Sequence, residues 1–168
     1  MSNSTVLFIR DTLLSVRNEL QNEIDSLTDE QLNTKFSEDK WSISQVIRHL
    51  IMLDNLILPT LRKTMQEESE PVTEKNLNFV LDRTKKMKAP GPEPLTEFIN
   101  KRDLLKVAKE ARTPILEIIN EFIDSTAMED KSMIHPAFGP LSVKQMIAFI
   151  GLHEKRHIEQ IKEIKENL

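Results

Sequence analysis

The chain contains Trp41-Ser42-Ile43-Ser44-Gln45-Val46, and it repeats the same pattern as Leu141-Ser142-Val143-Lys144-Gln145-Met146. Each copy has the form of a capping box, in which a serine hydroxyl accepts a hydrogen bond from the backbone of a glutamine three residues later, and the glutamine side chain reaches back. The apolar residues on either side of each box can pack together as a hydrophobic staple. Two long helices are therefore predicted, over residues 42–66 and 142–166.

Apolar residues at three- and four-residue intervals predict two further long helices, over residues 4–26 and 97–124. A short helical turn is predicted from Thr28, followed by an irregular connection. Pro114 falls inside the 97–124 helix and is expected to kink or break it near Arg112. The apolar residues of the first helix are Val6, Ile9, Leu13, Val16, Leu20 and Ile24, and those of the other are Leu104, Leu105, Ala108, Ile115, Ile118, Ile119 and Phe122.

Residues 67–95 form the longest segment without clear periodicity. Prolines mark both of its ends, at Pro71 and within Pro90-Gly91-Pro92-Glu93-Pro94. Its middle, Leu77-Asn78-Phe79-Val80-Leu81, is apolar enough to dock onto the rest of the protein. Because connections this long inside a compact domain are often functional, we interpret the segment as a lid that borders a site.

The composition is that of a globular protein, with 168 residues, 39% hydrophobic and 30% charged, and we expect one domain over residues 1–168. The net charge of −4 argues against nucleic-acid binding, which needs a basic surface. There is no signal-peptide pattern and no apolar run long enough to span a membrane, so a cytoplasmic location is expected. The absence of cysteine excludes disulfides, thiolate metal ligands and a cysteine nucleophile.

His153 and His157 are one helical turn apart, which places both imidazoles on one face of the 142–166 helix. That face is predicted to be the middle of a buried apolar stripe. Buried imidazoles need polar partners. A shared divalent metal would satisfy both, and separate hydrogen bonds are the alternative. The apolar stripe consists of Val143, Met146, Ile150, Ile161 and Ile164.

The string His153-Glu154-Lys155-Arg156-His157 also fits the H-E-x-x-H pattern of zinc peptidases, in which Glu154 would be the general base. Those enzymes usually take a third ligand from further downstream, and only eleven residues follow His157. We therefore expect a third ligand from upstream, and we favour a salt bridge or an interface contact for Glu154.

Two other histidines are available, His49 and His135. Counted from their helix caps, His49 lies at plus seven, His153 at plus eleven and His157 at plus fifteen. Steps of four keep all three near one helical face, so they converge if the two helices pack side by side. His135 precedes the last helix in a turn-rich loop. Three interpretations of His135 are open: a residue that contacts the metal ligands without binding the metal, an acid or base that faces the substrate, or a structural turn residue.

The stretch from Trp41 to Leu50 resembles the second-helix signature of the DinB-like superfamily, which includes the YfiT-type metal-dependent hydrolases. The stretches from His135 to Ser142 and from His153 to Gln160 resemble its C-terminal signature. The resemblance covers nearly the whole chain in the order and length of its elements. It implies an all-α four-helix bundle of up-and-down type with a long connection between its second and third helices, often as a homodimer.

The resemblance also implies a site for nickel, zinc or a similar divalent ion, with His49, His153 and His157 as ligands. Some members of the family resemble hydrolases, and others transfer low-molecular-weight thiols such as bacillithiol. An open three-imidazole site can activate water or polarise a carbonyl group.

Several functions stay open at this point. The chain is interpreted as a metal-dependent hydrolase of a small molecule, with His135 as an acid, or as a thiol transferase. A third interpretation is a non-enzymatic dimeric bundle whose metal fixes the helices or senses metal availability. A metal-free bundle with a hydrogen-bonded histidine core is the fourth. An apolar surface on the first and last long helices is the expected dimer interface.

Overall fold

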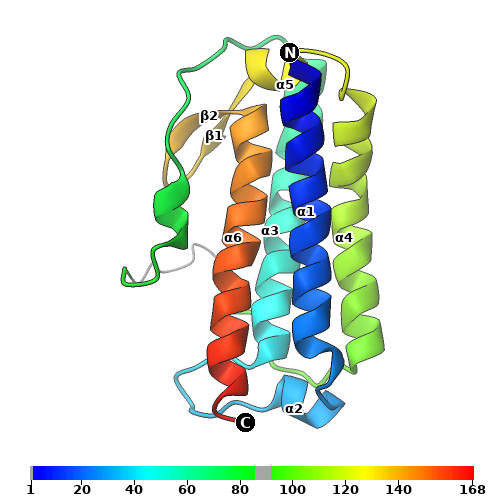
Figure 1. Cartoon of the computed structure of the whole chain (residues 1–168), viewed down its shortest axis with the longest axis vertical. Coiled ribbons are helices and arrows are strands. Elements are labelled where there is room, and N and C mark those ends of the chain that lie inside the picture. Colours follow the sequence, from blue (N-terminus) through cyan, green and yellow to red (C-terminus); the bar gives the residue numbers. More distant parts are fainter. Residues whose placement is uncertain (1, 86–91) are drawn as a thin grey trace.

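The computed structural model describes residues 2–85 and 92–168 and shows a mostly helical protein. Four long helices form a bundle in this part of the chain (Figure 1). They are α1 (Ser2–Asp25), α3 (Ile43–Gln66), α4 (Lys101–Glu121) and α6 (Val143–Lys165). The predicted all-α four-helix bundle with a long connection between its second and third helices is confirmed, whereas the up-and-down order is wrong because those two helices run in the same direction (Figure 1). No helix among the described residues is both long and apolar enough to cross a membrane.

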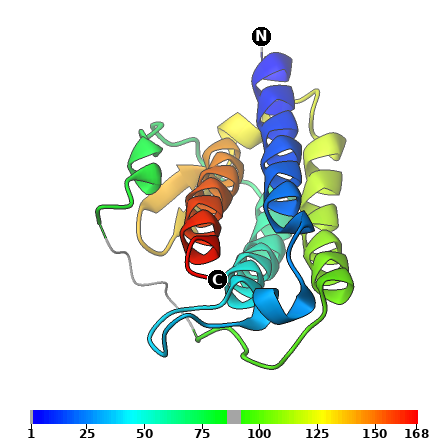
Figure 2. The same cartoon turned by 60° about the horizontal axis from the view of Figure 1, so that its bottom comes forward.

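Each long helix of the bundle has two neighbours. Helix α1 packs against α6 and α4, and α3 packs against the same two helices from the other side (Figure 2). Helices α1 and α6 run in one direction, whereas α3 and α4 both run in the other (Figure 1). The chain must therefore return along the bundle between α3 and α4, which explains the long connection. A short helix, α2 (Asp29–Asn33), joins α1 to α3.

The two predicted capping boxes differ in the structure. In the first, the Gln45 backbone donates to Ser42 Oγ at 3.3 Å, and Ser42 N donates to Gln45 Oε1 at 3.1 Å. In the second, the Gln145 backbone donates to Ser142 Oγ at 3.1 Å, but the Gln145 side chain donates instead to the carbonyl of Lys75 at 2.6 Å. The second box is thus only half formed, because its glutamine holds the long connection.

Helix α4 is shorter than predicted at both ends and continues through its middle. It begins at Lys101, where the side chain of Asn100 accepts from the backbone of Asp103, and it ends at Glu121. Pro114 lies inside the helix and does not break it. The buried residues Ile115, Ile118 and Ile119 follow the proline directly, so packing against the bundle core outweighs the lost backbone hydrogen bond.

A small antiparallel hairpin replaces the loop predicted at residues 135–140. Strand β1 (Ser132–His135) pairs with β2 (Gly139–Ser142), and His135 lies opposite Gly139. Gly139 has φ of +70°, a conformation that side chains disfavour, and this allows the tight turn between the strands. A short helix, α5 (Ala127–Asp130), precedes the hairpin.

The core consists of two apolar clusters separated by a layer of buried charge. One cluster includes Leu13, Ile57, Ile115 and Ile150, and the other includes Leu20, Ile47, Ala108 and Ile158. On α3, α4 and α6 one charged residue falls between the two clusters, and on α1 Arg17 follows Val16 close to the boundary between them. We call this layer the charged layer; it consists of Arg17, Asp54, Arg112 and Glu154.

The long connection docks onto α6, as its apolar middle predicted. Leu77 and Val80 are buried, and they lie in or beside the 3-10 helix η1 (Asn78–Leu81). Arg156 of α6 donates to the carbonyls of Val80, Asp82 and Lys85 at 2.6–2.9 Å. Residues 86–91 of the predicted connection lie outside the described residues.

Candidate metal centre

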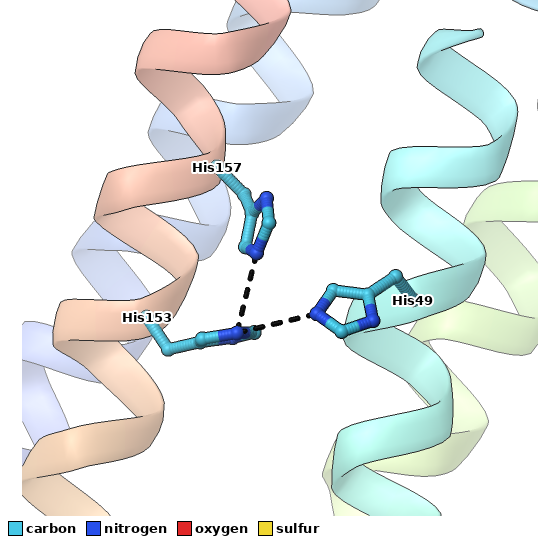
Figure 3. Close-up of side chains that lie close together, drawn as sticks. All are labelled: His49, His153 and His157. Atoms are coloured by element: carbon cyan, nitrogen blue, oxygen red, sulfur yellow. Dashed lines mark hydrogen bonds between the residues drawn. The ribbon is translucent and has the colours of Figure 1, made fainter. Parts of the chain in front are cut away.

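Three imidazoles converge between α3 and α6 (Figure 3). His49 Nε2 and His157 Nε2 each lie 3.2 Å from His153 Nε2. One nitrogen from each ring lies within 4.8 Å of the other two. The convergence expected from counting residues after the two caps is thus present, because α3 and α6 are neighbours in the bundle.

Hydrogen bonds alone cannot satisfy this arrangement. A ring nitrogen of a neutral imidazole carries either one proton or one lone pair, so His153 Nε2 can form a full hydrogen bond with only one of its two neighbours. A divalent cation accepts a lone pair from each nitrogen. Two nitrogens about 2.0–2.1 Å from a tetrahedral zinc ion are about 3.3 Å apart, close to the 3.2 Å found for two of the three nitrogen pairs. The donor set therefore fits a divalent ion.

The electrostatics of the cluster favour neutral rings. Burial, reinforced by the other two histidines, lowers the pKa of His153 to about 2. Burial also lowers the pKa of His157 to about 4. It lowers the pKa of His49 as well, although Glu93 acts in the opposite direction. Because a histidine must be unprotonated to bind a metal, all three are ready as ligands at neutral pH.

The predicted burial pattern of α6 is wrong at its centre. His153 and His157 are only partly buried, whereas Glu154 has an exposed fraction of 0%. Successive residues of a helix point about 100° apart, so the histidines face α3 and the connection while Glu154 faces the core. Glu154 accepts from Arg17 Nε at 2.6 Å and from Arg112 Nη2 at 2.8 Å. The salt-bridge interpretation of Glu154 is confirmed.

The other members of the charged layer were missed by sequence reasoning. Arg112 also donates to both carboxylate oxygens of Asp54, at 3.0 and 3.1 Å. Burial raises the pKa of Asp54 despite its arginine neighbours. Burial would also raise the pKa of Glu154, but Arg112 and Arg17 outweigh it and the pKa is lowered. The sequence did offer one signal for this layer: Arg112 is a charged residue at the centre of the apolar stripe of α4.

His135 lies apart from the three converging imidazoles. Its ring stacks on Phe138 at 4.2 Å and meets the edge of Phe149 at 4.6 Å, and Phe149 in turn lies 5.5 Å from the His153 ring. The backbone N–H groups of Ala137 and Phe138 both donate to His135 Nδ1. The ring proton is therefore assigned to Nε2. Burial lowers the pKa of His135, which favours this neutral form.

Trp41 does more than the staple predicted from the sequence. It packs against the apolar cluster that contains Val46, and its ring lies 5.2 Å from that of His49. The indole Nε1 donates to Glu93 Oε2 at 2.6 Å. Pro94 follows Glu93 in the chain, and its carbonyl accepts a hydrogen bond from Gln45 Nε2 at 3.1 Å. The end of the connection is thus fastened beside His49, a contact between distant segments that no local pattern announces.

Comparison with known proteins agrees with this arrangement. The family model of the DinB superfamily matches residues 12–161. The uncharacterized protein YuaE of Bacillus subtilis is 37% identical over 158 residues, which cover 90% of this chain and 94% of YuaE. A protein of Oceanobacillus iheyensis, whose name proposes a metal-dependent hydrolase, is 26% identical over 151 residues, which cover 86% of this chain and 76% of the relative.

A solved structure has the same fold. YfiT from Bacillus subtilis, described as a probable metal-dependent hydrolase with an unusual four-helix bundle topology, superimposes with a TM-score of 0.69 at 16% identity. The similarity covers 99% of this chain and 89% of YfiT. At this identity the likeness supports the fold alone. Because the family model matches most of its length, this chain belongs to the DinB superfamily.

Proposed function

We propose that the protein is a metal-dependent hydrolase that acts on a small molecule, with His49, His153 and His157 holding a nickel or zinc ion. The observation that carries the proposal is the approach of three Nε2 atoms, at 3.2 Å for two of the pairs. The name of the Oceanobacillus relative and the description of YfiT point to the same chemistry.

The side chains around the cluster have separate tasks in this proposal. Three neutral imidazoles leave coordination positions open, and a divalent ion there supplies Lewis-acid activation of water or of a carbonyl group. His135 holds a proton at Nε2, because its Nδ1 is occupied by two backbone N–H groups. It is thus set to donate a hydrogen bond from Nε2 to a bound substrate. The stack with Phe138 holds the ring in place.

We assign a substrate-facing role to the connection. The ring of Phe79 meets the edge of Phe138 at 5.0 Å, and Phe138 stacks on His135. Phe79 keeps an exposed fraction of 47%, so its removal changes the surface near His135 more than the core. Phe79→Ala is expected to raise KM or alter substrate preference; unchanged kinetics with every substrate would reject the lid interpretation.

The first experiment is metal analysis by mass spectrometry on untagged protein, with His49→Ala and His153→Ala beside the parent. We expect about one divalent ion per chain, lost in both variants and kept in His135→Ala. The identity of the ion decides between nickel and zinc. No metal after reconstitution would contradict the proposal. Turnover that requires an added thiol would reassign the site to thiol transfer.

We further propose a homodimer that uses the exposed apolar side chains of α1. Phe8 has an exposed fraction of 70%, and Leu7 and Leu14 of the same helix have exposed fractions of 41% and 43%. Apolar patches of this kind often mark protein interfaces. Light scattering should give the mass of two chains for the parent and of one chain for Phe8→Glu. A monomeric parent would contradict the proposal.

A further inference from the structure

We infer that Gln160 is a positioning residue that prepares His157 for metal binding, which rests on the proposed function. Gln160 lies three residues after His157 on α6, so the two side chains are neighbours on the helix surface. The Gln160 Oε1 atom lies 2.7 Å from His157 Nδ1. A partly buried hydrogen bond of this length restrains the imidazole ring.

The hydrogen bond also selects the tautomer. A carbonyl oxygen only accepts, so a bond to Gln160 Oε1 requires the proton of His157 to sit on Nδ1. The lone pair is then on Nε2, the atom that lies 3.2 Å from His153 Nε2. With the amide turned the other way, its NH₂ group would favour a proton on Nε2 and block that position. The orientation of one amide thus decides whether His157 can serve as a ligand.

The other ligand on α6 has no such support. His153 Nδ1 is buried and has no hydrogen-bond partner among the described residues. The neighbours of metal ligands commonly change metal affinity by about 10–100-fold when they are substituted. Gln160 therefore prepares one ligand of the pair, and His153 must be oriented by its packing and by the metal itself.

The tautomer can be measured without any metal. Nitrogen-15 NMR of the metal-free protein near neutral pH distinguishes a protonated from an unprotonated ring nitrogen. We expect His157 to be protonated at Nδ1 in the parent and to shift toward protonation at Nε2 in Gln160→Leu. A parent His157 protonated at Nε2 would overturn the inference. This result decides the role of Gln160 even if the parent binds no metal, in which case only the proposed function fails.

Metal affinity gives the second readout. Competition with a coloured chelator should show Co²⁺ binding to Gln160→Leu weakened by about 10–100-fold. Gln160→Glu should retain most of the affinity, because a carboxylate also accepts from Nδ1–H. The matched control is Glu159→Leu, at the adjacent exposed position, which should bind Co²⁺ like the parent. A Gln160→Leu affinity within about twofold of the parent, or equal losses in Gln160→Leu and Glu159→Leu, would overturn the inference.

Discussion

Glu154 directly follows a proposed metal ligand, yet its carboxylate lies in the charged layer of the core. Glu154→Ala leaves Arg17 and Arg112 with one carboxylate fewer in a buried site. Because breaking a buried ion pair strands a charge, we expect the free energy of unfolding to fall by about 3–5 kcal/mol. Urea denaturation measures this change. The exposed Glu159→Ala should have little effect, and equal effects of the two substitutions would refute the argument.

The histidine cluster makes the metal-free protein sensitive to acid. The folded-state pKa of His153 is about 2 and that of His157 is about 4, whereas both titrate near 6.5 in an unfolded chain. Below pH about 6.5 the unfolded chain takes up protons that the folded chain does not, so stability falls as the pH drops toward 4. Each histidine contributes up to about 1.4 kcal/mol per pH unit.

We therefore expect the urea midpoint of the metal-free protein to decrease between about pH 7.5 and about pH 5. A variant with both His153→Leu and His157→Leu should show a shallower decrease over the same range. The decrease of the urea midpoint that remains in this variant comes from other titrating groups. These include His49 and His135, whose pKa values burial also lowers. Identical slopes for the parent and this variant would show that the pair is not the source of acid sensitivity.

At the scale of elements, the long connection depends on α6 for its position. Arg156 donates to three carbonyl groups in and after η1. Arg156→Gln is expected to speed amide hydrogen exchange in residues 78–85 while leaving α3 unchanged, because exchange follows local opening. Lys155→Gln, at the adjacent exposed position, is the control. Equal exchange in the parent and Arg156→Gln would mean that Leu77 and Val80 hold the segment without the arginine.

The same scale shows what the sequence could predict. Caps and three- or four-residue periodicity are local patterns, so the sequence could predict where α3 and α6 start. Counting from these two caps also predicted that His49, His153 and His157 lie near one helical face. The charged layer joins residues 37 to 137 positions apart, so apart from the arginine in the apolar stripe of α4 it leaves no local pattern. The strands of the hairpin have four residues each, too few to alternate clearly. The second glutamine was assigned to its own helix cap because its partner, Lys75, is distant in sequence.

For the whole molecule, the bundle has sources of stability that do not involve a metal. Two apolar clusters and the charged layer connect all four long helices. We expect removal of metal by a chelator to leave the far-ultraviolet circular dichroism unchanged. Rebinding at about 100 times Kd should add about 2.7 kcal/mol, or about 5–10 °C in Tm. Loss of the helical signal on chelation would instead favour a structural metal.

The proposed ligands are divided unequally between two helices, and this has a practical consequence. His153 and His157 are fixed relative to each other by one turn of α6, whereas His49 comes from α3, 104 residues before His153 in sequence. Any shift of α3 along or away from α6 must change the angles between the ligands. The visible spectrum of a cobalt-substituted protein depends on these angles, so it would report a change in the separation of the two helices. It would register distant core substitutions or bound molecules that move one helix against the other.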